Sequence, residues 1–394
     1  MAVVEFRDVD IIFGGNTGPA LTLLDQGAGR EKILEETGNV LGVAGASLAV
    51  NAGEICVLMG LSGSGKSTLL RAVNGLNKVT RGQVLIEHNG QQINLPDCDA
   101  GTLRHLRMHR ISMVFQQFAL LPWRTVSENV GFGLELRGVG KRERSRIVEE
   151  KLELVQLDQW KNKFVHELSG GMQQRVGLAR AFATDADILL MDEPFSALDP
   201  LIRNRLQDEL LQLQERMHKT IIFVSHDLDE ALKIGNKIAI MDQARIVQYD
   251  SAEEIVRNPA NKYVADFVGH MNPLNVLKGR TLMTSTENIP QREGELFLDR
   301  AGYCRLKIDE ALSILSATSN GQPSKIVPYA GPDDIAGIEY DQFVTASADI
   351  MLRDVIEIRR CSGSPVLFVE DGKLIGMIGD DEIFEVFLNL QGSN

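Results

Sequence analysis

The chain has 394 residues, of which 44% are hydrophobic and 24% charged, as is typical of a globular protein with two or three domains. Its net charge of −13 argues against nucleic acid as a partner, because a phosphate backbone attracts a basic surface. With four scattered cysteines, no secretory leader and no long apolar run, we expect a reduced, cytoplasmic protein that is neither exported nor membrane-spanning.

Short apolar runs alternate with helical patterns up to about residue 268. Strand-length apolar runs occur at 54–60, 111–115, 187–192, 220–225 and 237–242. Helical patterns lie between them at 67–76, 143–156, 200–218 and 228–234. Nearly continuous apolar strands separated by helices are typical of a mostly parallel sheet that is covered on both faces. The sequence therefore predicts an α/β fold.

Two segments interrupt this alternation, and a third follows it. Residues 16–42 predict two short helices that end at Gly27 and Gly38. Residues 116–176 predict a helical insertion without a convincing strand. Residues 271–394 carry 11 Lys/Arg and 19 Asp/Glu, more than half of the acidic excess, which favours a separate C-terminal domain.

The segment GLSGSGKST at 60–68 follows an apolar strand and precedes a helix, as a phosphate-binding loop requires. Its glycines allow backbone N–H groups to approach phosphate oxygens, Lys66 reaches the terminal phosphates, and Ser67 can ligate Mg²⁺. The alternative is a plain glycine-rich turn. We expect nucleotide contacts from the whole loop, namely Gly60, Leu61, Ser62, Gly63, Ser64, Gly65, Lys66, Ser67 and Thr68.

Polar side chains end three other predicted strands. Asp192 is a candidate Mg²⁺ partner, and Glu193 can orient or deprotonate an attacking water. His226 is a candidate γ-phosphate contact, and Gln116, or its neighbour Gln117, is a candidate for Mg²⁺ and water. Each of these residues alone is more often structural, but the carboxyl ends of parallel strands meet at one edge, beside the phosphate loop.

The segment HELSGGMQQRVGLAR at 166–180 opens a predicted helix that Ser169 caps and that Gly170 and Gly171 leave bare. A helix N-terminus with free N–H groups and a partial positive charge attracts anions. A plain capped helix, the alternative, needs no two successive glycines. This N-terminus is therefore suited to bind an anion.

The chain contains, in this order, the phosphate loop, Gln116, LSGG at 168–171, LLMDEP at 189–194, SALD at 196–199 and His226. Together these features resemble the ATP-binding-cassette ATPases over about residues 1–268. The resemblance implies ATP and Mg²⁺ as cofactors. It also implies a P-loop NTPase fold, with a RecA-like core, an antiparallel β subdomain and a helical insertion.

In that family, two copies pack head to tail, and the LSGG segment serves the ATP of the opposite copy. The resemblance thus implies trans contacts from Ser169, Gly170 and Gly171, with Asp199 linking the two sites. Met172 stands where the family usually has Gln, a role that Gln173 could take. For stacking on adenine the best match is Phe13, whose alternative is simple core packing.

A single cassette without a membrane span disfavours exporters with fused spans and soluble members with two cassettes. Residues 115–136 resemble the importer type, in which this surface receives a helix of the membrane permease. Pro122 and Trp123 are the docking candidates, unless Trp123 merely packs the helical insertion.

The cassette also resembles the ATPases of glycine betaine, proline betaine and choline importers, with the choline-uptake type as the nearest match. This resemblance is carried by the insertion at 16–42, the phosphate-loop region, LSGGMQQRVGLARAF and FSALDPLIR. This implies a peripheral ATPase on the cytoplasmic face of a bacterial inner membrane, with a permease and, indirectly, a periplasmic binding protein as partners. The alternatives are an importer for another small solute such as an amino acid, a soluble non-transport ATPase of this family, and a ligand sensor.

The C-terminal part matches that family incompletely. Residues 345–389 resemble one cystathionine-β-synthase-type module. The expected order of elements is a helix, a strand, a hairpin turn at Asp371-Gly372, a second strand and a closing helix. We therefore expect a cassette at 1–268, a degenerate linker or regulatory region at 269–344, and a small α+β module at 345–394. Sensing of a nucleotide or of ionic strength, and a stabilising or dimer-contact role, both stay open.

Overall fold

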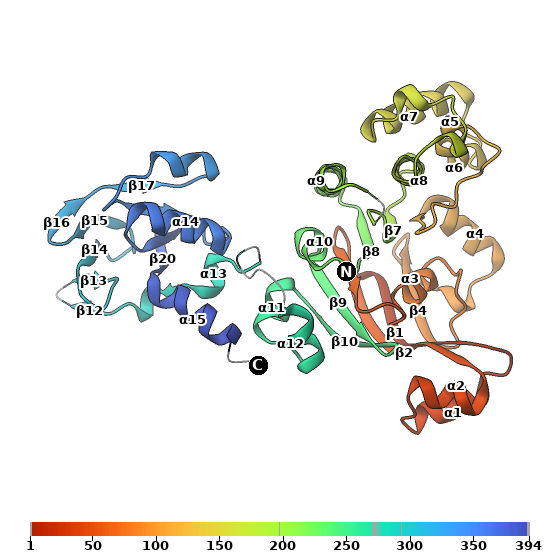
Figure 1. The fold of residues 1–394 in the computed structure, drawn as a ribbon, viewed down its shortest axis with the longest axis horizontal. Coiled ribbons are helices and arrows are strands. Elements are labelled where there is room, and N and C mark those ends of the chain that lie inside the picture. The colour runs from red at the N-terminus through yellow and green to blue at the C-terminus, as the bar shows by residue number, and fades with distance from the viewer. Residues whose placement is uncertain (1, 197, 270–273, 275, 293, 392–394) are drawn as a thin grey trace. The chain divides into compact units, whose positions relative to one another are not determined.

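The computed structural model describes residues 2–196, 198–269, 274, 276–292 and 294–391. They form two compact units, Met1–Ile255 and Val256–Asn394, each with its own sheets (Figure 1). Ala197, within the SALD motif, lies outside the described residues. Within the described part of the chain, no helix is long and apolar enough to span a bilayer.

A six-stranded sheet organises the first unit. Its order is β10-β9-β3-β8-β7-β6, with parallel pairing from β9 to β6 and β10 antiparallel at the edge. All residues of β3, β7 and β8 are buried, as expected for strands covered on both faces. The five predicted strands are confirmed within two residues. The bounds are β3 (Ile55–Met59), β6 (Ile111–Val114), β7 (Ile188–Asp192), β8 (Thr220–Val224), β9 (Lys237–Asp242) and β10 (Arg245–Asp250).

The helices that accompany this sheet supply much of its core. Leu69 and Leu70 of the helix after the phosphate loop are fully buried against Leu58, Leu190 and Ile222 of the sheet. This packing fixes the loop beside the carboxyl ends of the strands. The helices are α3 (Lys66–Ala72), α4 (Ala100–His109), α9 (Pro200–Met217) and α10 (Leu228–Ile234). Helix α11 (Ala252–Arg257) contains the boundary between the two units.

A second, antiparallel sheet of order β2-β1-β4-β5 shares this core through Phe6 and other buried side chains. It is the antiparallel subdomain that the resemblance implied. Its strands are β1 (Ala2–Phe13), β2 (Val40–Asn51), β4 (Arg81–His88) and β5 (Gln91–Asn94).

The two short helices predicted for residues 16–42 are present as α1 (Gly18–Asp25) and α2 (Arg30–Thr37), side by side in Figure 1. Gly27 (φ 81°) and Gly38 (φ 68°) have left-handed backbones that end them, a conformation glycine adopts at little cost. Leu24 and Ile33 of the pair are buried in a small cluster with Ile12 of β1 and Leu41 of β2.

Helices α5 (Val126–Val130), α6 (Phe132–Leu136), α7 (Lys141–Leu154) and α8 (Gly170–Ala183) gather at one end of the first unit, as Figure 1 shows. Helix α8 packs on α7 and α5 and also contacts β6 of the parallel sheet. It runs seven residues beyond the predicted end of the insertion at 176. The helical subdomain is therefore continuous with the sheet domain through α8.

The second unit contains two five-stranded sheets and several helices. One sheet has the order β11-β20-β19-β18-β17, and the other, antiparallel throughout, has the order β12-β13-β14-β15-β16. The first sheet comprises β11 (Thr284–Ser285), β17 (Ile326–Pro328), β18 (Phe343–Ala346), β19 (Val366–Glu370) and β20 (Lys373–Ile378). The second comprises β12 (Gln291–Arg292), β13 (Glu295–Phe297), β14 (Cys304–Ile308), β15 (Ile314–Ser319) and β16 (Gln322–Ser324). The helices are α12 (Lys262–Val268), α13 (Gly279–Leu282), α14 (Leu352–Ser362) and α15 (Asp380–Gln391).

The structure differs here from the expected linker at 269–344. Leu296 and Leu306 of the antiparallel sheet are buried in one cluster with Phe343, Leu367 and Met377 of the other sheet. Residues 291–324 thus fold together with the C-terminal elements, and the compact unit begins near residue 256 instead of 269. The strands of the antiparallel sheet are only two to six residues long, too short to show a clear alternation in the sequence.

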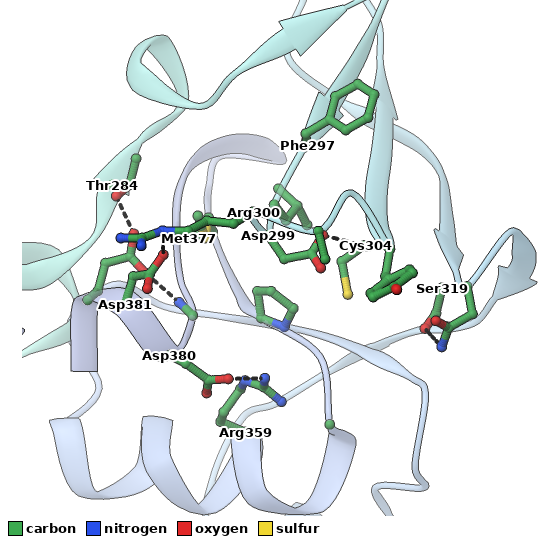
Figure 2. A pocket seen from close by; sticks show the side chains of 18 of the residues that line it. Thr284, Phe297, Asp299, Arg300, Cys304, Ser319, Arg359, Met377, Asp380 and Asp381 are labelled. Carbon is green, nitrogen blue, oxygen red and sulfur yellow. Dashed lines mark hydrogen bonds and ion pairs between the residues drawn. The ribbon is translucent and has the colours of Figure 1, made fainter. Parts of the chain in front are cut away.

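A cavity of about 570 Å³ lies within the second unit, between the antiparallel sheet and the start of α15 (Figure 2). Ion pairs cross its lining, Arg359 with Asp380 and Arg300 with Asp381, each at 2.8 Å. The Thr284 hydroxyl donates to Glu382 at 2.5 Å. These contacts fasten the first turn of α15 to the rest of the unit.

Candidate functional site

The phosphate loop joins β3 to α3 in a backbone that only glycine fits. Gly60 has φ 139° and Gly65 has φ 105°. A Cβ on Gly60 would lie 2.0 Å from the Met241 carbonyl oxygen, and one on Gly65 would lie 2.4 Å from the Gly42 carbonyl oxygen. These are far below contact distance, so the loop is held tightly against its neighbours.

Lys66, the first residue of α3, points back along this loop. Its Nζ donates to the carbonyl oxygens of Gly60 (2.8 Å) and Leu61 (2.9 Å). Burial lowers the pKa of its ammonium group, and the carboxylates of Glu193 and Asp192 oppose this effect. A buried ammonium with carbonyl partners can exchange them for phosphate oxygens.

Asp192, the last residue of β7, is fully buried and uses both carboxylate oxygens. Ser67 Oγ donates to Oδ1 at 2.7 Å, and Arg71 Nη2 donates to Oδ2 at 2.7 Å. Arg71, which no motif singles out, follows Ser67 by four residues and so shares its helix face. Arg71 balances the buried charge of Asp192.

Glu193 lies at the centre of the polar groups at this edge of the sheet. Its Oε2 is 3.2 Å from Gln116 Nε2 and 3.3 Å from His226 Nδ1. Its backbone is left-handed (φ 49°), and its carbonyl oxygen accepts from the buried Gln174 Nε2 at 3.3 Å. Gln174, which sequence reasoning missed, links the helical subdomain to the backbone of Glu193. Glu193 is therefore held with its side chain toward Gln116 and His226.

A cavity of about 470 Å³ brings most of the predicted residues together. Its wall is formed by the phosphate loop, the residues that follow β6, β7 and β8, the end of β1 and the start of β2. Phe13, the last residue of β1, is 41% exposed and is not core-packed as the alternative supposed. Arg30 of α2, a further residue that sequence reasoning missed, also lines it. The lining residues are Phe13, Arg30, Val40, Gly42, Ser62, Gly63, Gly65, Lys66, Ser67, Thr68, Gln116, Glu193 and His226.

Other predicted residues lie around this cavity instead of lining it. Gly60 and Leu61 contribute carbonyl oxygens to Lys66, Asp192 lies behind Ser67, and Ser64 is buried. They support the loop from behind.

The residues predicted to act in trans are not brought to the cavity of their own chain. Ser169 caps α8 by accepting from Met172 N at 3.4 Å, and it is exposed together with Gly170. Gln173 donates to the carbonyl oxygens of Val165 and Leu168, within its own segment. Asp199, also exposed, caps α9 by accepting from Ile202 N at 3.1 Å. Both N-termini are open on the surface of the first unit.

A buried hydrogen-bond network includes Ser225, the residue before His226. Glu230, only 8% exposed, accepts from Ser225 Oγ at 2.5 Å and from Gln207 Nε2 at 3.0 Å. Burial raises the pKa of its carboxyl group, and the hydrogen bonds from Ser225 and Gln207 oppose the shift. The folded protein therefore holds the proton on Glu230 to a higher pH than the unfolded chain.

From this shift we expect a pH-dependent stability that Glu230→Gln removes. Because the folded pKa is raised, the stabilising contribution is complete below the unfolded pKa and is lost as the pH rises through the folded value. We therefore expect the wild type to lose more of its free energy of unfolding than Glu230→Gln when the pH is raised from 4.5 to 8.

Urea unfolding followed by tryptophan fluorescence measures this, because both tryptophans, Trp123 and Trp160, belong to the first unit. The matched control is Glu215→Gln, which removes an exposed charge from α9. Parallel pH profiles of wild type and Glu230→Gln would contradict the prediction.

Comparison with known proteins agrees with this geometry. The family model described as ABC transporter matches residues 43–196. The chain is 40% identical to the glycine betaine transport ATP-binding protein OpuAA of Bacillus subtilis, over 99% of this chain and 95% of that protein. It is 48% identical to the glycine betaine/proline betaine transport system ATP-binding protein ProV of Escherichia coli, over 72% and 70%.

Among solved structures, the chain is similar to the dimeric structure of MJ0796, a bacterial ABC transporter cassette, with a TM-score of 0.55 and 29% identity over 63% of this chain and 98% of that one. A second match is the same cassette in a post-hydrolysis state bound to ADP and Pi, with a TM-score of 0.54 and 30% identity, over 63% of this chain and 98% of that one. Both the fold and the full-length likeness lead to one conclusion: the chain belongs to the ABC transporter family, as one of its ATP-binding, ATP-hydrolysing subunits.

Proposed function

We propose that this chain drives the import of a quaternary or related methylated amine through a separate membrane permease, by hydrolysing ATP between two copies of itself. The observation that carries the ATPase part is the cavity in which the phosphate loop faces Glu193, Gln116 and His226. The solute class is supported by the names of relatives, which include a trimethylamine N-oxide transport protein of Pelagibacter ubique at 45% identity over 73% of this chain and 83% of that protein.

In this proposal, Lys66 and the N–H groups of the phosphate loop hold the β- and γ-phosphates, and Phe13 stacks on adenine. Glu193 accepts a proton from the water that attacks the γ-phosphate in line, while Gln116 and His226 keep that carboxylate and the water in place. The distances of 3.2 and 3.3 Å from Glu193 to these two side chains support the shared role.

The residues around Ser67 fit a magnesium ion. Mg²⁺ prefers oxygen ligands and retains several waters, so one hydroxyl, one amide and one carboxylate near the phosphates suffice. Ser67, Gln116 and Asp192 supply these oxygens, and Ser67 and Asp192 are already within 2.7 Å of each other. Bound Mg²⁺ would neutralise charge on the β- and γ-phosphates. Arg71 holds the Asp192 carboxylate in place for this role.

A second copy would complete each site. Ser169 and Gly170 are exposed, Gly171 is half-buried, and none of them lines the cavity of its own chain, so this N-terminus can meet the γ-phosphate on a partner. The exposed Asp199 lies on the same proposed interface. Similarity to a cassette solved as a dimer supports this arrangement.

The permease would dock on the helical subdomain. Trp123 is 71% exposed, so the alternative in which it packs the helical insertion is wrong. Such a large exposed aromatic ring, next to the exposed Pro122, is typical of an interface anchor.

We therefore expect Trp123→Ala to leave the ATPase activity of the isolated subunit unchanged and to weaken its affinity for permease-containing membranes about tenfold or more, as for interface anchors. Trp160→Ala is the matched control in the same subdomain, and co-sedimentation with permease vesicles is the measurement. Equal co-sedimentation of both variants would contradict the docking role.

The solute and the location are tested together by reconstitution. The chain, its permease and the periplasmic binding protein that we propose for it are assembled in vesicles, and uptake of glycine betaine, proline betaine, choline and an amino acid is compared, with Lys66→Ala as the ATP-deficient control. ATP-dependent uptake of a methylated amine supports an importer on the cytoplasmic face of the membrane, whereas uptake of the amino acid alone supports the rival solute. ATP hydrolysis without any binding to the permease would indicate a non-transport ATPase.

A further inference from the structure

We propose that Arg30, carried by the insertion helix α2, is a second cationic contact for the nucleotide phosphates, beside Lys66. This inference rests on the proposed function, because it takes the 470 Å³ cavity to be the ATP site. It gives the insertion at 16–42 a role in nucleotide binding that neither the motifs nor the comparisons assign.

The insertion leaves and re-enters the sheet at the cavity itself. Strand β1 ends at Phe13 and β2 begins at Val40, and both residues line the cavity. Between them, α2 directs Arg30 to the phosphate loop, where Nη1 donates to the Gly63 carbonyl oxygen at 2.6 Å. Arg30 is thus both a lining residue and a direct neighbour of the loop.

The charge of Arg30 is not neutralised within the protein. Across the residues that the structure describes, no carboxylate forms an ion pair with it, whereas Arg71 of the same site is paired with Asp192 at 2.7 Å. The one hydrogen bond to Gly63 occupies one of the five N–H donors of a guanidinium. Arg30 therefore keeps both its charge and donors for a ligand.

The place of Arg30 in its helix makes an anionic ligand the natural partner. It is the first residue of α2, after the N-cap Gly29, where the partial positive charge of the helix disfavours a cation. The N-terminus of α3, with Lys66, adds positive charge nearby. A polyphosphate relieves this repulsion, and no other group in the cavity does so except Glu193.

The insertion presents Arg30 on a fixed scaffold. Ile33 of α2 and Leu24 of α1 are buried with Leu41 and Ala44 of β2. Arg81 bridges the insertion to the sheet through Asp25 (2.8 Å) and the buried Asp10 (2.6 Å). The guanidinium is therefore held in position before a nucleotide arrives.

Binding of ATP and of AMP to the full-length chain tests the proposal, with Arg30→Ala, Arg30→Gln and Arg30→Lys compared by fluorescent-nucleotide displacement. Loss of a hydrogen bond to a charged partner predicts about tenfold or more weaker ATP binding in Arg30→Ala and Arg30→Gln, a smaller loss in Arg30→Lys, and a smaller change for AMP. Lys32→Ala is the matched control, because Lys32 is exposed on the same helix and pairs with Glu36 at 3.7 Å.

Arg30→Gln separates charge from support of the loop, since an amide can still donate to the Gly63 carbonyl oxygen. Wild-type ATP affinity in Arg30→Gln, or equal losses for ATP and AMP in Arg30→Ala, would overturn the phosphate contact. Both outcomes differ from failure of the proposed function itself, in which the unmodified chain would not bind ATP at all.

Discussion

Replacing Glu193 by Gln is expected to slow steady-state ATP hydrolysis about 10²- to 10⁴-fold, the range that a general base contributes, while ATP binding is retained. Glutamine is nearly isosteric and keeps an oxygen for Gln116 Nε2 and His226 Nδ1, now 3.2 and 3.3 Å from the carboxylate. It cannot accept a proton from water. The loss should therefore fall on kcat and spare nucleotide affinity.

The same variant should accumulate as a dimer with ATP trapped between the copies, because closure no longer leads to hydrolysis. Gel filtration with and without MgATP measures this, and radiolabelled phosphate release measures turnover. Glu215→Gln, the same substitution on an exposed face of α9, should hydrolyse ATP at the wild-type rate and elute without a trapped species. Normal turnover by Glu193→Gln would remove Glu193 from the base role.

The phosphate loop and the strands around it could be predicted because their signals are local. A buried strand, a glycine-rich turn and a helix follow each other within residues 54–76, and β3, β7 and β8 are nearly continuous apolar runs. Parallel pairing then places the residues at the strand ends on one edge, so the neighbourhood of Asp192, Glu193 and His226 follows from topology. Arg71 was equally predictable, since it lies one helical turn from Ser67.

Other features have no local signal. The antiparallel sheet of the second unit is built from short strands whose side chains become a core only when they meet Phe343 and Leu367 from 20 or more residues away. Arg30 reaches Gly63 across 33 residues of sequence, by way of an insertion whose orientation depends on the packing of Ile33 and on the ion pair of Arg81 with Asp25. Long-range packing of this kind is decided by tertiary structure, which neither periodicity nor motif spacing encodes.

The second large effect is expected at Ser169, which does not reach the cavity of its own chain. Ser169→Ala is expected to lower ATP hydrolysis about 10²-fold, as for loss of a donor that stabilises transition-state charge, while each chain still binds ATP. Ser169 also caps α8, and loss of such a cap costs about 1 kcal/mol of stability. Thr125→Ala controls for this, because it removes the cap of α5 in the same subdomain without touching the LSGG segment.

Mixed dimers distinguish an ATP site formed by two copies of the chain from a site formed by one copy alone. If each site combines Lys66 of one copy with Ser169 of the other, a dimer of Lys66→Ala and Ser169→Ala chains collects both lesions in one site and leaves the second intact. Two nearly inactive variants mixed in equal amounts should then recover about a quarter of wild-type activity, because half of the dimers in a two-fold assembly are mixed and each has one working site.

This recovery cannot arise if Ser169 acts on the ATP of its own chain, because every site would then carry one lesion. The measurement is ATP hydrolysis after subunit exchange, with each variant mixed with itself as the baseline. Activity no higher than that baseline, in mixtures shown by differential tags to contain mixed dimers, would mean that the bare N-terminus of α8 does not serve the opposite copy. The exposure of Ser169 and Gly170 would then need a different explanation, such as contact with the permease.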